Sequence, residues 1–253
     1  LVSSIKSTDA AITDDVTAAA APIEAVLAAA GSGTRMGLDT PKQYLVLGAL
    51  TVLEHSVAAL RKCRRIGRIV IALPPDDEFF APLPLTRDPG IITVTGGASR
   101  AQSVLNALEA VTSADVLVHD CARPCVASRD IDELIARCAG TAEGGILCAP
   151  VAATLKKADP ADPGRIACTV SRQGMYEALT PQLFNTAKLR ATLKDGLSQN
   201  LTLTDEASAF EAQGIHPQLV VARHPNPKLT TPADTALITW LLSTGKAEKT
   251  EAE

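Results

Sequence analysis

The sequence predicts an α/β fold, a mainly parallel sheet flanked by helices, and three observations lead to it. Short apolar runs of strand length recur along the 253 residues, and segments of helical periodicity alternate with them. Most of these runs are apolar almost without interruption, as expected for strands that are covered on both faces. Aromatic residues make up only 3% of the chain, so the core is expected to be aliphatic.

The expected strands are the apolar runs themselves, and the first of them ends in a row of small residues. In a parallel α/β sheet, ligands bind at the carboxyl ends of the strands, so we expect functional residues directly after them. The strand segments are Ile23–Ala30, Arg68–Pro74, Ile91–Gly97, Ala114–Asp120, Gly144–Val151 and His216–Ala222.

Helices are expected between the strands, and several begin at a residue that favours an N-cap. Two lie in TVLEHSVAALRKC and RAQSVLNALEAV, whose apolar residues recur with helical spacing. Ser128 is expected to cap a third helix, and Thr231 to cap the last one. In TDEAS, Thr204 is expected to cap a helix whose N-terminal dipole is opposed by Asp205 and Glu206.

The segment Val151–Pro181 breaks the alternation of strands and helices. The turn signal DPADPG lies between two extended pieces, Thr154–Lys157 and Ile166–Val170. This pattern predicts a projecting β-arm at about 151–173. An isolated two-stranded arm is only marginally stable in water, so we expect it to rest on a second subunit of a homodimer.

Composition and the chain ends restrict the remaining possibilities. The net charge of −4 argues against a nucleic-acid-binding surface, and no apolar run is long enough to span a membrane. The six cysteines form no C-x-x-C pair, which favours reduced thiols and a cytoplasmic protein, or one of the plastid stroma if the source is a plant or alga. The expected organisation is a flexible tail at 1–21, a single domain at 22–242 and a second tail at 243–253.

The stretch LAAAGSGTRMGLDTPKQYL follows the first strand, where α/β proteins hold phosphates. Met36 replaces a glycine of the dinucleotide fingerprint, and neither register of the P-loop motif fits. Small residues still let backbone N–H groups approach phosphate oxygens, and Arg35 and Lys42 add two positive charges. Such a loop suits phosphoryl or nucleotidyl transfer, although a surface turn with two solvated cations remains an alternative at this point.

A family resemblance extends this interpretation. The A-A-G-x-G-x-R-M-G…P-K pattern resembles the signature loop of nucleotidyltransferases. Together with PKQYLVLGALTVLEHSV, VHDCARPCV, GGILCAPVAATLK, ALTPQLF, TDEASAFEAQG and HPNPKLTTPAD, it resembles the 2-C-methyl-D-erythritol 4-phosphate cytidylyltransferases of the non-mevalonate isoprenoid pathway. The similarity runs from about Ile23 to Leu242 and implies a Rossmann-like sheet of the nucleotide-diphospho-sugar-transferase type.

The resemblance implies a reaction without a protein nucleophile. A phosphate oxygen of 2-C-methyl-D-erythritol 4-phosphate (methylerythritol phosphate) would attack the α-phosphorus of CTP, giving 4-diphosphocytidyl-2-C-methyl-D-erythritol and pyrophosphate. Catalysis would then consist mostly of positioning and charge stabilisation, with Mg²⁺ as the expected divalent cation. The chain departs from the family at Ala98, where an acidic residue is common, and at Cys121, where a small residue is common.

The resemblance also implies roles for individual residues. Arg35 and Lys42 would stabilise the transition state, and Asp120 would contact the ribose or Mg²⁺. Thr154 and Arg172 lie on the two sides of the arm, which in the family crosses to the neighbouring subunit, so they would complete the partner's site. The CTP-binding residues would be Ala29, Ala30, Gly31, Gly33, Gly97, Ser103, Asp120 and Cys121, and those that bind methylerythritol phosphate would be Thr154, Arg172, Thr180 and Lys228.

Three other functions remain open from the residues alone. A nucleotidyltransferase acting on ribitol 5-phosphate or a sugar phosphate would share the CTP half of the site. A non-catalytic nucleotide-binding homologue is disfavoured by the presence of Arg35, Lys42 and Asp120. A dinucleotide-dependent oxidoreductase is disfavoured by Met36 in the loop.

Overall fold

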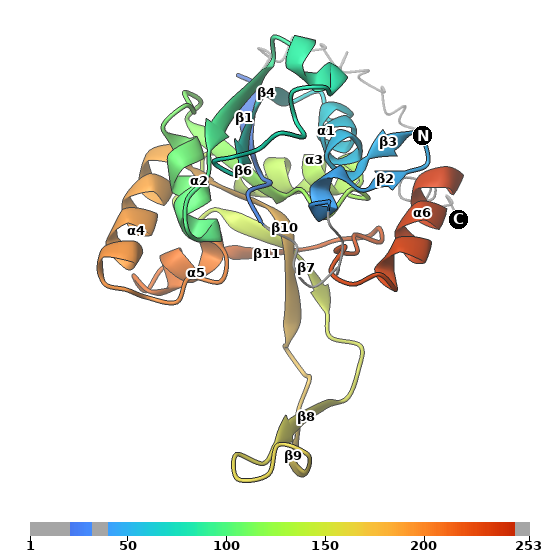
Figure 1. Ribbon diagram of the computed structural model, residues 1–253. Coiled ribbons are helices and arrows are strands. Elements are labelled where there is room, and N and C mark those ends of the chain that lie inside the picture. The colour runs from blue at the N-terminus through green and yellow to red at the C-terminus, as the bar shows by residue number, and fades with distance from the viewer. Residues whose placement is uncertain (1–20, 32–39, 246–253) are drawn as a thin grey trace, which may run out of the picture.

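The computed structural model describes residues 21–31 and 40–245 and has a seven-stranded sheet at its centre (Figure 1). The strands are β1 (Ile23–Ala28), β4 (Ile66–Leu73), β5 (Ile91–Thr95), β6 (Asp115–Asp120), β7 (Gly145–Pro150), β10 (Tyr176–Asn185) and β11 (Gln218–Val221). Their order is β11-β7-β10-β6-β1-β4-β5, and every neighbouring pair is parallel except the two that involve β10. The predicted mainly parallel α/β fold is therefore confirmed.

Strand β10 is the element of the sheet that the sequence pattern did not predict. It lies between β6 and β7 and runs antiparallel to both, because the chain enters it directly from the arm without a crossover helix. Its outer residues are exposed and its inner residues, from Leu179 to Phe184, are buried. The polar residues Thr180 and Gln182 interrupt the apolar run, which hides the strand from a hydropathy pattern.

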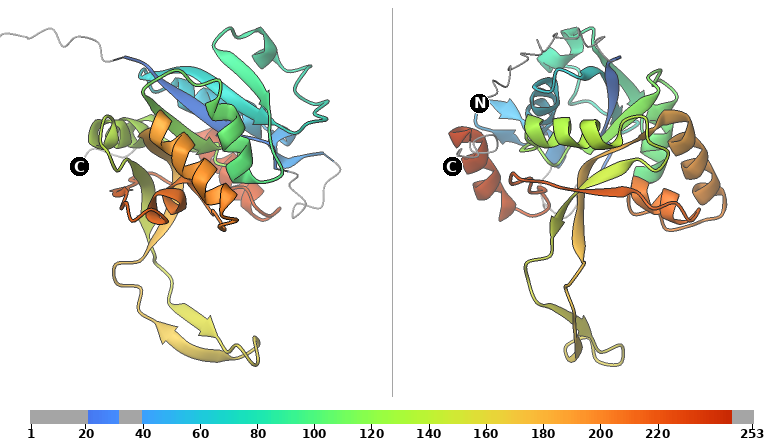
Figure 2. Two further views of the ribbon diagram at one scale, coloured as in Figure 1. Left: turned by 90° about the vertical axis from the view of Figure 1, so that its left-hand side faces the viewer. Right: turned by 180° about the vertical axis from the view of Figure 1, so that it is seen from behind.

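Helices cover both faces of the sheet, and alternating residues of each central strand enter two separate core clusters. Leu27 and Leu117 pack in the first cluster, with α1, α3 and α6, whereas Val26 and Val118 pack in the second, with α2, α4 and α5. Figure 2 shows the second group of helices together on one side of the sheet. The helices are α1 (Val52–Arg61), α2 (Arg100–Leu108), α3 (Ser128–Cys138), α4 (Thr186–Ser198), α5 (Glu206–Glu211) and α6 (Asp234–Thr244).

Three of the predicted N-caps are wrong by one or a few residues. The chain already turns at Ala127, so Ser128 is inside α3 rather than its cap. Helix α5 is capped by Asp205 instead of Thr204, because the Asp205 carboxylate accepts the backbone N–H of Ser208 in a capping box. The last helix begins at Asp234, not after Thr231.

The predicted arm is present and projects away from the sheet (Figures 1 and 2). Its two strands, β8 (Leu155–Ala158) and β9 (Ile166–Val170), pair antiparallel with each other, and the first residues of β10 pair with the end of β7 at its base. No residue from 151 to 178 is buried. The arm therefore has no core of its own in a single chain.

A short connection after β1 leads into the site. It contains the 3-10 helix η2 (Lys42–Tyr44) and the small hairpin β2 (Val46–Leu47) and β3 (Leu50–Thr51), and a second 3-10 helix, η3 (Pro84–Arg87), precedes β5. Among the residues that the structure describes, no helix has the length and apolar character needed to cross a bilayer. The expected terminal tails, apart from the last helical turn of α6, lie outside the described residues.

Candidate active site

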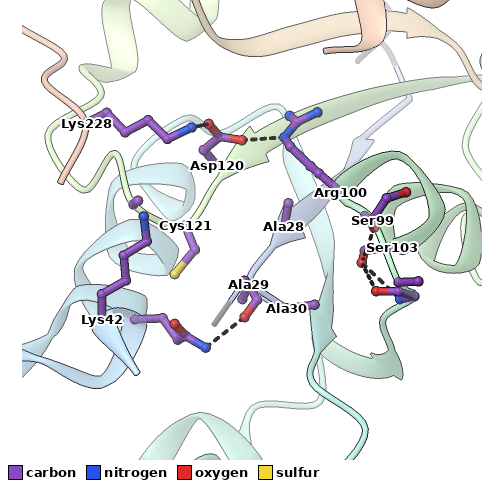
Figure 3. Close-up of a pocket in the computed structure, with 15 residues that line it drawn as sticks. Ala28, Ala29, Ala30, Lys42, Ser99, Arg100, Ser103, Asp120, Cys121 and Lys228 are labelled. Carbon is purple, nitrogen blue, oxygen red and sulfur yellow. Dashed lines mark hydrogen bonds and ion pairs between the residues drawn. The ribbon is translucent and has the colours of Figure 1, made fainter. Parts of the chain in front are cut away.

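A pocket of about 360 Å³ opens at the carboxyl ends of β1 and β6, beside the N-terminus of α2 (Figure 3). This is the edge at which a parallel α/β sheet places its ligand. The pocket is lined by Ala28, Ala29, Ala30, Gly31, Lys42, Gln43, Gly97, Ala98, Ser99, Arg100, Ser103, Asp120, Cys121, Ala122 and Lys228.

Small residues after β1 form the floor of the pocket. Strand register places Ala28 beside Asp120, and the Cys121 N–H donates to the Ala28 carbonyl at 3.2 Å. Ala30 lies so close to Gly96 that a Cβ on that glycine would come within 2.4 Å of the Ala30 Cβ. The ends of these segments approach one another closely because their side chains are small or absent.

Helix η2 is fixed against the floor by a residue that sequence reasoning missed. Gln43 is buried, and its Nε2 donates to the Ala29 carbonyl at 2.9 Å. The preceding residue, Lys42, lines the pocket, and its Nζ donates to the Leu229 carbonyl at 3.1 Å. The only sequence signal for Gln43 was its position next to Lys42 in the P-K-Q block. Its hydrogen bond to Ala29 could not be predicted, because it depends on how the chain folds back between the two residues.

The loop before α2 closes the opposite side of the pocket. Ser99 caps α2 by accepting the Gln102 N–H, and the buried Ser103 hydroxyl accepts the Gly97 N–H at 3.0 Å. The Ser103 Oγ also donates to the Ser99 carbonyl at 2.9 Å. A Cβ on Gly97 would lie 2.2 Å from the Gln102 Cγ, so the loop needs glycine there. Ser103 thus visibly shapes this loop, while its contact with cytosine stays a prediction.

A chain of alternating charges crosses the pocket. Lys228 Nζ lies 2.7 Å from Asp120 Oδ2, and Arg100 Nε lies 2.9 Å from Asp120 Oδ1 (Figure 3). The same guanidinium donates to both oxygens of Glu206, at 2.7 and 3.0 Å. Arg100 was not predicted as a site residue, although an arginine in the first turn of a helix, where cations are disfavoured, is an informative signal.

The pKa values of the groups in this chain of alternating charges depend on their neighbours. Burial alone would raise the pKa of Asp120, but Arg100 and Lys228 hold it well below its ordinary value. Burial alone would lower the pKa of Arg100, but Glu206 and Asp120 raise it. Burial raises the pKa of Glu206, and Arg100 opposes that rise. Asp120 is therefore an anion held between two cations.

Cys121 is not placed to act as a nucleophile. Burial, reinforced by the charge of Asp120, raises the pKa of its thiol above the ordinary value. Its backbone is also engaged, since Ser56 Oγ donates to the Cys121 carbonyl at 2.6 Å and the N–H bonds to Ala28. The residue contributes the wall of the pocket and the geometry of the strand end.

Thr180 lies behind Asp120 and does not line the pocket. His119 is fully buried, and burial lowers its pKa to about 4, so the ring is neutral near pH 7. Its Nε2 lies 3.0 Å from the Arg123 carbonyl, which only accepts, so Nε2 carries the proton and Nδ1 accepts from the Thr180 hydroxyl at 3.0 Å. The Thr180 oxygen in turn accepts the Asp120 N–H at 3.0 Å. The hydroxyl proton of Thr180 is thus engaged within the protein.

The remaining predicted site residues do not meet at this pocket. Thr154 and Arg172 are exposed on the arm, and the Arg172 guanidinium donates to the Ala152 carbonyl. Arg35 and Gly33 lie outside the described residues. The structure brings together Ala29, Ala30, Gly31, Lys42, Gly97, Ser103, Asp120, Cys121 and Lys228.

The donor set fits a metal that is carried in largely by a substrate. Among residues 21–31 and 40–245 no group of three or more His, Cys, Asp or Glu side chains could hold a metal ion. Asp120 is the only acidic side chain among the described residues that line the pocket. Mg²⁺ commonly uses one or two carboxylates, substrate phosphates and water, so a single carboxylate is compatible with a metal–nucleotide complex.

Comparison with known proteins agrees with the predicted fold and family. The family model described as 2-C-methyl-D-erythritol 4-phosphate cytidylyltransferase matches residues 23–244. A protein of that name from Cronobacter sakazakii is 48% identical over 224 residues, covering 88% of this chain and 94% of its own length. One from Escherichia coli O1:K1 / APEC is 49% identical over 220 residues, covering 87% and 93%.

Solved structures lead to the same family. A crystal structure titled 4-diphosphocytidyl-2C-methyl-D-erythritol synthase superposes with a TM-score of 0.75 at 35% identity, covering 88% of this chain and 99% of its own. The 2-C-methyl-D-erythritol 4-phosphate cytidylyltransferase of Thermus thermophilus superposes with a TM-score of 0.72 at 30% identity, with the same coverage. The chain belongs to the 2-C-methyl-D-erythritol 4-phosphate cytidylyltransferase family.

Proposed function

We propose that the pocket binds CTP and that this chain transfers its cytidylyl group to the phosphate of methylerythritol phosphate, releasing pyrophosphate. The observation that carries the proposal is the convergence of Lys42, Lys228 and the Asp120–Arg100 pair on a pocket with a floor of small residues. The attacking phosphate is already ionised near pH 7, so no general base is required. The work of the protein is to align two anions and to stabilise the charge that builds on the α-phosphorus.

The cations divide between the two substrates. Lys42 lies on η2 and lines the pocket, and we assign to it, together with Arg35, the stabilisation of the α-phosphorus under attack. Lys228 faces the same pocket from the segment before α6. It binds the phosphate oxygens of methylerythritol phosphate as a point charge. Removing one preorganised charge of this kind costs a few kcal/mol of transition-state stabilisation.

The nucleoside end of CTP lies between the floor and the loop before α2. Ala29, Ala30 and Gly31 offer backbone groups, and the segment of Gly97 faces them across the pocket. Among the residues that the structure describes, a Cβ on Gly31 would meet nothing within 4 Å, which leaves room on this side for a ligand. Cytosine is then read by backbone groups rather than by an acidic side chain, since position 98 is alanine.

Asp120 would hold Mg²⁺ together with the triphosphate oxygens of CTP. When bound, the metal neutralises phosphate charge and fixes the phosphate geometry. Asp120 already has both oxygens paired, so Lys228, which is about one-third exposed, is the partner that can turn towards a phosphate. Arg100 stays on Asp120 because it is held by Glu206 as well.

The site is completed by the arm of a second subunit. Thr154 and Arg172 are exposed on an arm that buries nothing in its own chain, and they supply the methylerythritol phosphate contacts of the neighbouring pocket. Mixing a Lys42→Ala chain with an Arg172→Ala chain tests this arrangement. At methylerythritol phosphate concentrations well below the raised KM of Arg172→Ala, both variants turn over poorly. A mixed dimer has one pocket with both residues intact, so random mixing of the two variants then restores about a quarter of wild-type activity. No recovery in refolded mixtures contradicts a shared site.

Substrate choice is tested by crossing nucleotides with acceptors. Pyrophosphate release is measured with CTP, ATP, GTP or UTP and with methylerythritol phosphate or ribitol 5-phosphate. We expect release only with CTP and methylerythritol phosphate. Activity with ribitol 5-phosphate alone would favour the alternative, which shares the nucleotide half of the site, and binding of CTP without turnover of either acceptor would indicate a non-catalytic homologue.

A further inference from the structure

Glu206 is a buried charge that the proposed reaction does not use. It is 0% exposed and occupies the first position of α5, directly after the capping residue Asp205. Both of its oxygens accept N–H groups from Arg100, at 2.7 and 3.0 Å, which is the bidentate arrangement of an ionised carboxylate with a guanidinium. Its charge is therefore directed at one arginine of the pocket.

The guanidinium of Arg100 connects Glu206 to Asp120 in the pocket. Arg100 uses Nη1 and Nη2 for Glu206, and its Nε donates to Asp120 Oδ1 at 2.9 Å. Because the guanidinium is planar and rigid, fixing two of its nitrogens also fixes the direction of the third. The position of the Asp120 carboxylate is thus tied to that of Glu206, although the two residues are 86 positions apart.

The N-terminus of α5 is itself anchored on the sheet. Gln182 of β10 is buried, and its Nε2 donates to Asp205 Oδ2 at 2.9 Å. Its Oε1 accepts the Ala207 N–H at 3.1 Å. One side chain of the central sheet therefore holds both neighbours of Glu206, which fixes the backbone position from which its carboxylate reaches Arg100.

Without Glu206, Arg100 would have other partners. Its side chain is 27% exposed and lines the pocket, beside the N-terminus of α2 where anions bind favourably. A guanidinium fork released there would turn to the phosphates of a bound nucleotide, which match it bidentately. Asp120 would then lose the Arg100 donor on Oδ1 and keep Lys228 on Oδ2.

We propose that Glu206 is a positioning residue for cytidylyl transfer: it holds Arg100 on Asp120 and keeps the guanidinium fork away from the nucleotide phosphates. The inference rests on the proposed function and adds a division of labour among the cations. Lys42 and Lys228 serve the phosphates, whereas Arg100 is reserved for Asp120. Stability alone is a weak reason for a buried Arg100–Glu206 pair, because buried ion pairs contribute little net stability compared with apolar packing. A role in positioning Arg100 gives the pair a function.

The test is the Glu206→Gln variant, measured for turnover, CTP affinity and thermal unfolding. We expect turnover to fall about 10–100-fold, as is typical when the partner that orients a functional ligand is removed. We expect the dissociation constant for CTP to stay the same or to decrease, because the freed Arg100 adds a cation for the phosphates. Glu211→Gln, at an exposed position of the same helix, is the matched control and should retain wild-type turnover.

A double-mutant cycle with Arg100→Met tests whether Glu206 acts through Arg100. If it does, adding Glu206→Gln to Arg100→Met changes turnover by less than about twofold, because the partner is already missing. Effects that multiply in the double variant would overturn the proposal. So would wild-type turnover in Glu206→Gln, or a loss of CTP affinity that parallels the loss of turnover.

A second variant keeps the proposal testable if Glu206→Gln does not fold. Arg100→Lys retains the charge on α2 but lacks the planar fork, so it should lower turnover while CTP still binds. Wild-type turnover in Arg100→Lys would contradict the role assigned to the fork. Failure of the proposed function is recognised separately, since the wild-type chain would then release no pyrophosphate from CTP and methylerythritol phosphate.

Discussion

The pocket end of the sheet and the projecting arm are held in opposite ways. At the pocket, Asp120 is buried and is held by Arg100, by Lys228 and, through its backbone, by Thr180. On the arm, no residue from 151 to 178 is buried, and the two strands pair only with each other. The pocket is held by contacts within its own chain, whereas the described residues provide no buried contacts for the arm.

We expect this difference to separate the two substrates: the nucleotide would bind within one chain, and the acceptor would need a second subunit. The pocket proposed for the nucleotide is lined by residues at the ends of β1 and β6 and by the start of α2, all from a single chain. The residues proposed for the acceptor, Thr154 and Arg172, are exposed on the arm of that chain. Nucleotide binding is thus expected to tolerate changes on the arm, while acceptor binding is not.

The largest effect is expected from Lys42→Ala, which removes a charge from the fixed half. Turnover should fall by about 10³-fold, roughly 4 kcal/mol, while CTP affinity changes far less, because the charge acts mainly on the transition state. Pyrophosphate release and calorimetric titration with CTP measure the two quantities. The exposed Lys194→Ala is the control. Near-normal turnover of Lys42→Ala would exclude its assigned role.

The second effect concerns the stability of the fixed half as a function of pH. Burial lowers the pKa of His119 from 6.5 to about 4, so below pH 6.5 the unfolded chain binds a proton that the folded ring does not. His119 therefore makes the free energy of unfolding fall as the pH drops from about 6.5 to about 4, by at most ~3 kcal/mol.

Urea unfolding of the wild type and of His119→Gln across this pH range measures that contribution. The variant should lose this part of the pH slope, whereas His216→Gln, at an exposed histidine, should keep it. Because Asp120 and Glu206 also titrate with shifted pKa values, only the difference between variant and wild type isolates His119. Parallel slopes in wild type and His119→Gln would show that His119 takes up its proton at the same pH in the folded and the unfolded protein.

A smaller effect is expected from Arg172→Ala, which changes the arm alone. The KM for methylerythritol phosphate should rise about 10–100-fold, the value of a charge-assisted hydrogen bond to phosphate. CTP affinity should remain within about twofold, because the nucleotide half is formed without the arm. Arg165→Ala, at an exposed position of the arm, is the control. If the binding of CTP and of methylerythritol phosphate weakened equally, the proposed separation of a nucleotide half and an acceptor half would be wrong.

The smallest effect is expected from Ile166→Ala at low protein concentration. Ile166 is 65% exposed, so the free energy of unfolding should change by less than about 0.5 kcal/mol. Leu117→Ala, at a fully buried position of β6, should cost about 2–5 kcal/mol. A loss in Ile166→Ala that grows with protein concentration would place this side chain in a subunit interface.

Much of the fold was predictable because its signals are local. The apolar runs of β1, β4, β5, β6, β7 and β11 are continuous, and the turn DPADPG marks the arm. Strand β10 was missed since Thr180 and Gln182 interrupt its apolar pattern, and each of these side chains is satisfied only by partners from other segments. The shifted caps at Ser128, Thr204 and Thr231 show that a favourable residue type does not fix the helix boundary.

The predicted site shows the same limit. Family blocks identified Lys42, Asp120 and Lys228, and the structure brings all three to one pocket. Arg100 and Glu206 carried no motif that pointed to each other, because the ion pair depends on how α5 packs beside α2. Thr180 was assigned to substrate from its block, whereas its hydroxyl is engaged with His119 and Asp120.

The sequence by itself determined the family, the α/β class and the presence of the arm. These follow from patterns that lie within a few residues of one another, such as strand periodicity, turn residues and motif spacing. Only the tertiary structure decided that Asp120 is held between Arg100 and Lys228, that Glu206 is the buried counterion of Arg100, and that no residue from 151 to 178 is buried in the described part of the chain. Burial and charge pairing join residues that are distant in sequence, so their strength is defined only once the chain has folded.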